Sequence, residues 1–184
     1  MDAVAHQYYI AVYIRMSNKS KIKGKSWERD VATFLSRLYD EPFLRVPNSG
    51  AFVGGYNIYR TQTMTEQQVN SFKGDIIPGP SFKNLVIECK NYKEFPFHKL
   101  LFDQDCKQLD EWIKQVQGSC EVGDKWLLCV KVTHKSCFVV WDFDQIQCPS
   151  DGEYKDYQFA EYNNFWDENS SEVKASCQKM YNPD

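Results

Sequence analysis

A carboxylate and an ammonium group share one face of an otherwise apolar stretch at residues 85–90. The stretch reads LVIECK. Side chains of a strand alternate between its two faces, so Glu88 and Lys90 point the same way. A Glu-x-Lys pattern alone has little meaning, because any solvated strand face can contain it. Its position inside an apolar strand favours a chemical role over surface charge.

A second carboxylate is predicted to face Glu88. The Pro-Gly-Pro set at residues 78–80 separates residues 75–77 from residues 85–90, which predicts an antiparallel hairpin. If residue 75 pairs with 88, then 76 meets 87, and Asp75 and Glu88 point to the same side with Cβ atoms ~5 Å apart. Two carboxylates at that distance repel unless a cation neutralises them, and their oxygens suit Mg²⁺. We therefore predict a divalent-metal site here, with Lys90 at its rim to orient or deprotonate an attacking water.

A third acid comes from the first predicted helix, residues 25–39. Its apolar positions recur at intervals of three and four, and Pro42 prevents continuation beyond them. Glu28 lies at the edge of the apolar stripe, so it can point from the buried face toward the sheet as another metal or water ligand. The expected site is a cluster of three acids and one lysine.

The remaining pattern predicts the elements that would position this site. A short strand is expected at residues 43–46, a helix at 103–117, a central strand at 126–132 and a further strand at 137–143. The stripe of the second helix consists of Phe102, Cys106, Leu109, Trp112, Ile113 and Val116. The fold class is therefore a single α/β domain, a mixed central sheet flanked by helices.

Charge is distributed unevenly along the 184 residues. The net charge is −3, but residues 1–100 carry 14 Lys+Arg against 9 Asp+Glu, whereas residues 101–184 carry 8 against 16. The basic stretch at residues 15–29 is either a phosphate-binding arm or a solvated face. The acidic, aromatic segment after residue 142 should repel a polyanion, so its removal after Ser150 should not weaken DNA binding. Its aromatic side chains are expected to cover the core or a subunit interface.

Several classes of protein and site are disfavoured. No apolar run reaches the ~18 residues that cross a bilayer, and no secretory signal is visible, so a cytoplasmic protein is expected. The seven cysteines are odd in number and lack framework spacing, which indicates free thiols. Zinc-site, phosphate-loop, dinucleotide and nucleophile-elbow motifs are not found. No cofactor beyond a metal ion is implied.

Taken together, these residues resemble the PD-(D/E)XK nuclease superfamily, and within it the archaeal-type Holliday-junction resolvases and their phage relatives. The similarity covers residues 20–143 and lies in four segments, residues 23–30, 43–50, 74–77 and 86–90. The resemblance implies a restriction-endonuclease-like core that binds Mg²⁺, with Mn²⁺ as a substitute. It also implies roles for individual residues: metal ligands Glu28, Asp75, Glu88 and the carbonyl of Cys89; a catalytic Lys90; and DNA contacts at Arg29, Arg45 and Ser49.

The DNA-binding surface expected from both arguments adds Lys21, Lys23 and Lys25 of the basic stretch. Gln108, on the second helix, either supports the site or is solvated. Two features depart from the resolvases: the stretch between residues 50 and 73 is longer, and the segment after residue 143 has no evident counterpart.

The expected organisation is an N-terminal extension at residues 1–20, a nuclease domain at 21–148 and an acidic aromatic segment at 149–184. The expected function is metal-dependent cleavage of branched DNA, most specifically of four-way junctions, by a homodimer in a bacterial or phage-infected cell. A C₂ dimer presents one site to each of the two equivalent scissile strands of a junction. A nuclease for DNA ends, flaps or a specific duplex, and a DNA-binding module that does not cut, are the alternatives.

Overall fold

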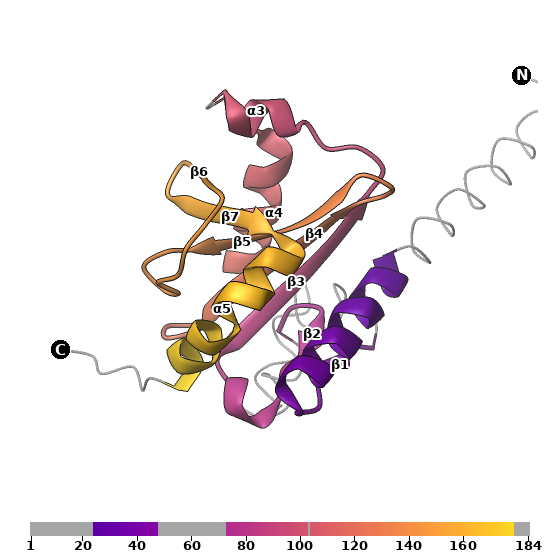
Figure 1. Ribbon diagram of the computed structural model, residues 1–184, viewed down its shortest axis with the longest axis vertical. Helices are drawn as coiled ribbons and strands as arrows, with labels where there is room; N and C mark the ends of the chain where they lie inside the picture. The colour runs from indigo at the N-terminus through magenta and orange to yellow at the C-terminus, as the bar shows by residue number, and fades with distance from the viewer. Residues whose placement is uncertain (1–23, 48–72, 103, 179–184) are drawn as a thin grey trace, which may run out of the picture.

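The computed structural model describes residues 24–47, 73–102 and 104–178 (Figure 1). Within them, seven strands form one mixed sheet in the order β1-β2-β3-β4-β5-β7-β6. Only β3 and β4 are parallel among these strands, and the other neighbours are antiparallel. The strands are β1 (Leu44–Arg45), β2 (Ile76–Ile77), β3 (Leu85–Tyr92), β4 (Lys125–Val132), β5 (Ser136–Asp142), β6 (Gly152–Tyr154) and β7 (Tyr157–Glu161). The predicted α/β class is confirmed, and the predicted central strand is β4, the fourth of the seven.

Helices cover both faces of the sheet (Figure 1). The first is drawn in indigo and covers residues 24–39 of the described chain, which include the whole of the helix predicted at residues 25–39. The others are α3 (Phe97–Leu101), α4 (Lys107–Gln117) and α5 (Tyr162–Gln178), with a short 3₁₀ helix, η2 (Pro80–Phe82), between β2 and β3. The crossover from β3 to the parallel β4 runs through α3 and α4. No helix in the described part of the chain is both long enough and apolar enough to span a membrane.

The β2–β3 hairpin has the predicted register. Ile76 pairs with Ile87, and the amide of Asp75 donates to the carbonyl of Ile87 at 2.8 Å. Gly74 permits this approach: it has φ +66°, and a Cβ there would lie 2.5 Å from the carbonyl oxygen of Ile87. Asp75 is therefore held opposite Glu88.

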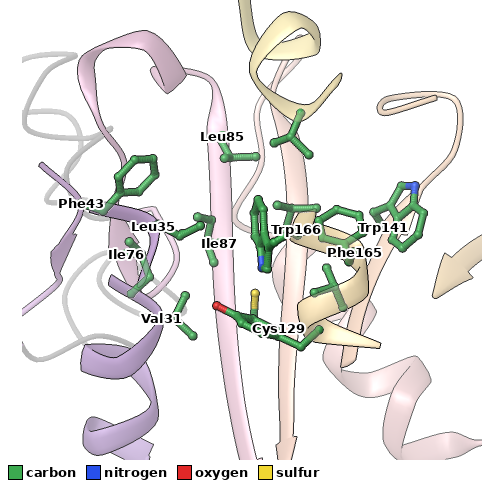
Figure 2. Packing of buried hydrophobic residues seen from close by; sticks show 14 of the residues in the cluster. Val31, Leu35, Phe43, Ile76, Leu85, Ile87, Cys129, Trp141, Phe165 and Trp166 are labelled. Atoms are coloured by element: carbon green, nitrogen blue, oxygen red, sulfur yellow. The ribbon is translucent and has the colours of Figure 1, made fainter. Parts of the chain in front are cut away.

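One face of the sheet packs against both the helix over residues 24–39 and α5. The first helix contributes Val31 and Leu35, and α5 contributes Phe165 and Trp166, all buried against sheet residues (Figure 2). The indole N–H of Trp27 also donates to the carbonyl of Cys129, at 3.0 Å. The helix that carries Glu28 is thus fixed to the centre of the sheet, and its orientation depends in part on α5.

The other face packs against α4. Leu109, Trp112, Ile113 and Val116 are buried against β3 and β4, as their spacing predicts. The predicted start of this helix at residue 103 and the place of Phe102 in its stripe are wrong. The chain leaves α3 at Phe102 and enters α4 at Lys107, so Phe102 does not continue the α4 stripe and is 71% exposed.

The C-terminal segment continues the same sheet. β7 pairs with β5, β6 pairs with β7, and α5 follows directly. The sequence predicted none of these three elements. Its aromatic side chains Phe165 and Trp166 lie in the core that α5 shares with the first helix. All seven cysteines are free, and five of them are buried, in agreement with the prediction.

Candidate active site

Three carboxylates are buried beside the β2–β3 hairpin. Glu28 is 8% exposed, Asp75 7% and Glu88 5%, and no other acid among the described residues is buried. They come from three separate elements: the first helix, the turn before β2 and the middle of β3. Acids are almost never fully buried unless they are paired. The three acids that the sequence selects therefore share an environment that surface charges do not have.

Glu88, Lys90 and a glutamine of α4 form a closed set of hydrogen bonds. The ammonium of Lys90 donates to Oε1 of Glu88 at 2.8 Å and to Oε1 of Gln115 at 2.8 Å. The amide nitrogen of Gln115 donates to the same Glu88 oxygen at 2.6 Å. Gln115 therefore fixes the distance between the acid and the lysine.

The sequence analysis named a different glutamine, Gln108. It lies on α4 seven residues earlier and is partly exposed. Seven residues are close to two helical turns, so both glutamines fall on nearly the same side of the helix. Helical periodicity was the available signal, and it does not say which turn lies beside Glu88.

Asp75 is oriented by the strand that carries Glu88. Its Oδ2 accepts a hydrogen bond from the amide of Cys89 at 2.9 Å. The backbone carbonyl of Asp75 accepts from the amide of Val46, at 2.9 Å, which ties the same turn to the residue after β1. Asp75 is thus positioned by backbone groups on two sides.

Glu28 forms an ion pair with Arg45 of β1. The guanidinium Nε lies 2.7 Å from Oε2 of Glu28, and both side chains are largely shielded, at 20% and 11% exposure. Arg45, expected at the DNA backbone, therefore lies within the site. Lys25 and Arg29 are exposed on the first helix. Three further expected DNA contacts, at Lys21, Lys23 and Ser49, lie outside the described residues.

The electrostatics of the site are dominated by buried negative charge. Burial, followed by the charge of Asp75, raises the pKa of Glu88 to about 7, with a smaller contribution from Glu28. Lys90 acts in the opposite direction by pairing with the carboxylate. Compared with an ordinary glutamate, Glu88 therefore holds its proton to a higher pH in the metal-free protein, because loss of that proton places a buried negative charge beside Asp75.

This raised pKa predicts how stability depends on pH. Between pH 4.5, the ordinary pKa of a glutamate, and about pH 7, the folded protein keeps a proton on Glu88 that the unfolded chain has already released. Its contribution to the free energy of unfolding should therefore fall as pH rises through this window. In EDTA, Glu88→Gln should be more stable relative to wild type at pH 8 than at pH 5, as measured by urea denaturation.

The control for this experiment is Glu111→Gln, which neutralises an exposed acid on α4. It should give the same stability difference from wild type at both pH values. If Glu88→Gln behaves like this control, Glu88 does not carry the buried, repelled charge described above.

The residue types of the site fit a divalent cation. Carboxylate and main-chain carbonyl oxygens are the ligands of Mg²⁺, and the repulsion that raises the pKa of Glu88 is what such a cation offsets. In residues 24–47, 73–102 and 104–178, however, no three His, Cys, Asp or Glu side chains are grouped closely enough to hold an ion together. Arg45 and Lys90 bond to two of the three carboxylates instead. The ligand set Glu28, Asp75, Glu88 and the carbonyl of Cys89 stays a prediction.

Comparison with known families gives one match. Residues 19–176 match the model of a family described as "Phage putative PDDEXK endonuclease". The protein belongs to this family of PD-(D/E)XK endonucleases. Such nucleases generally use divalent metals. Comparisons with curated proteins and with solved structures gave no match.

The range of the family match changes one part of the sequence interpretation. The resemblance seen in the sequence ended at residue 143, whereas the PD-(D/E)XK family model continues to residue 176. It therefore includes β6, β7 and most of α5. Residues 149–176 of the acidic aromatic segment are therefore part of what this protein shares with its family.

Proposed function

We propose that this PD-(D/E)XK endonuclease hydrolyses phosphodiester bonds in branched DNA with Mg²⁺, and that its preferred substrate is a four-way junction. The observation that carries the proposal is the opposition of Asp75 and Glu88 across the β2–β3 hairpin, with the ammonium of Lys90 2.8 Å from Glu88. Two acids and a lysine in this arrangement are what a metal-assisted attack of water on phosphorus needs.

Each residue has a distinct part in the proposed reaction. Asp75, Glu88 and the carbonyl of Cys89 would hold the cation, with Glu28 as a further ligand directly or through water. A bound divalent cation stabilises charge on the phosphate and makes a water more acidic. Lys90 orients the attacking water and offsets phosphate charge. Gln115 contacts neither water nor DNA in this proposal; its hydrogen bonds to Lys90 and Glu88 hold those two side chains at a fixed distance.

The proposed DNA surface begins at the first helix. Lys25 and Arg29 are exposed there, on the helix that also carries Glu28. Lys21, Lys23 and Ser49 are proposed as further phosphate contacts. Arg45 can bind either Glu28 or a DNA phosphate, because a phosphate at the site would compete with Glu28 for its guanidinium group. Release of Glu28 by this competition would make its carboxylate available to the metal.

The junction preference rests on the resemblance to resolvases and on symmetry. A four-way junction has two equivalent scissile strands, and a C₂ homodimer with one site per subunit meets both. We therefore propose a homodimer. We also propose that residues 1–20 are an N-terminal extension, and that the nuclease domain, expected at residues 21–148, continues through β6, β7 and α5, which share its sheet and core.

The test is cleavage of labelled four-way junction, flap, single-stranded and plain duplex DNA in Mg²⁺, Mn²⁺ or EDTA. We expect paired, symmetric cuts in the junction with either metal and none in EDTA. The oligomer's mass should be measured in the same buffer. Preferential cutting of flaps, ends or duplex would replace the junction proposal, and cleavage that persists in EDTA would contradict the metal site.

A further inference from the structure

Tyr92 is an exposed aromatic ring on the same face of β3 as Glu88 and Lys90. It follows Lys90 by two residues, which places its Cα ~6.6 Å further along that face. Residues 85–89 of β3 are buried, but Tyr92 is 44% exposed. The strand thus ends beside the candidate site with an aromatic surface open to solvent.

The ring of Tyr92 is supported from behind by α4. Its centroid lies 4.7 Å from that of Trp112, which is 4% exposed and stacks in turn on Phe95 at 5.7 Å. The carbonyl of Tyr92 accepts a hydrogen bond from the amide of Thr133, at 2.8 Å, so the backbone is fixed as well. The ring is therefore held in place before any ligand arrives.

The helix that supports Tyr92 also positions the candidate catalytic pair. Trp112 and Gln115 are three residues apart on α4 and so lie on neighbouring positions of one helix face. Gln115 bonds to Glu88 and Lys90, and Trp112 packs against Tyr92. A single rigid contact between β3 and α4 thus fixes the position of the ring relative to the candidate site.

We propose that Tyr92 stacks against a base of the DNA strand that is cut, and that this base is unpaired next to the scissile phosphate. This inference rests on the proposed function. A rigid ring with an open surface takes the π-face of any nucleobase. In the sequence Lys90 precedes the ring by two residues and the exposed Lys93 follows it, next to the exposed Glu94. A base in a continuous duplex has both faces covered by its neighbours. The substrate class is therefore DNA with an unstacked base at the site, such as a branch point or a single strand.

The test compares the full-length variants Tyr92→Ala, Tyr92→Leu and Tyr92→Phe in EDTA. Fluorescence anisotropy would measure their affinity for labelled single-stranded, four-way-junction and plain duplex DNA. Tyr92→Ala should weaken binding of the single strand and the junction by roughly five- to 150-fold, the range of one base stacked on one aromatic ring. Tyr92→Leu, which keeps apolar packing on Trp112, should lose nearly as much, and Tyr92→Phe should bind as wild type. Plain duplex should bind equally to all three.

The salt dependence of binding separates stacking from loss of phosphate contacts. The slope of log affinity against log salt should be unchanged in Tyr92→Ala, because no charge is removed. Phe143→Ala is the matched control: Phe143 is also 44% exposed but follows β5 at the opposite end of the β4–β5 pair. It should leave all three affinities unchanged. Thermal denaturation would verify that every variant is folded.

Three results would overturn the inference. If folded Tyr92→Ala binds single-stranded and junction DNA as tightly as wild type, the ring does not stack on a base, although the nuclease proposal survives if the protein still cuts. If Tyr92→Ala is monomeric where wild type is dimeric, the ring belongs to the subunit interface. If the wild-type protein binds no DNA at all, the proposed function fails together with the inference.

Discussion

Glu88→Gln and Asp75→Asn should each lower the rate of DNA cleavage by at least about 10²-fold, the loss that follows removal of one group that stabilises transition-state charge. Each substitution removes a negative charge from the proposed cation site while keeping the shape of the side chain. Both proteins should stay folded, because each substitution relieves the repulsion between two buried carboxylates and keeps a side-chain oxygen that can accept the existing hydrogen bonds. Single-turnover cleavage of a labelled junction in Mg²⁺ measures the effect, and anisotropy shows whether DNA is still bound.

The neighbours of Glu88 provide graded controls for this experiment. Lys90→Ala should be nearly as inactive, because the attacking water loses its partner. Gln115→Ala should cut more slowly than wild type but faster than Lys90→Ala, because Gln115 acts only by positioning. Gln108→Ala, two turns away on the same helix, should cut normally. Near-normal cleavage by Glu88→Gln would show that the acids and the lysine are not the active site.

Trp166→Ala should lower the free energy of unfolding by about 3–5 kcal/mol, the usual cost of removing a large buried aromatic side chain. Trp166 is fully buried and contacts rings from both α5 and the first helix, among them Phe34, Tyr39, Tyr162 and Phe165. Urea denaturation measures the loss. Asp167→Ala, at the adjacent exposed position, should change stability by no more than about 0.5 kcal/mol.

The position of Trp166 also changes the expectation that removal of the residues after Ser150 leaves DNA binding intact. Their removal deletes β6, β7 and α5, uncovers the sheet face beneath α5 and leaves β5 as an exposed edge. We now expect the truncated protein to be unfolded. A truncated protein with a cooperative unfolding transition near that of wild type would contradict the role assigned to α5.

Local patterns predicted the elements that carry the site. The helix over residues 24–39 followed from its apolar spacing, and the pairing of Ile76 with Ile87 followed from the turn residues between two short runs. Both signals arise from neighbours in sequence, which constrain geometry directly. For the same reason the three buried acids could be selected before their surroundings were known.

Features that depend on distant contacts were not predictable in this way. The bond between Gln115 and Glu88 depends on how α4 lies across β3, and helical periodicity permits Gln108 equally well. The ion pair between Glu28 and Arg45 joins residues 17 positions apart. The C-terminal strands were hidden because their segment was interpreted by its charge, whereas its pairing with β5 depends on the assembled sheet.

The strands that carry the candidate site differ in length, and so in the free energy that local unfolding of each requires. β1 and β2 have two residues each, whereas β3 is paired with β4 along eight consecutive positions. Short edge elements undergo local opening at a lower free energy than the centre of a sheet, and hydrogen exchange detects the difference. We therefore expect the turn that carries Asp75, next to the two-residue β2, to open before the eight-residue β3 that carries Glu88 and Lys90. We therefore expect moderate warming to separate the two carboxylates and to abolish DNA cleavage reversibly, while most of the sheet is still folded.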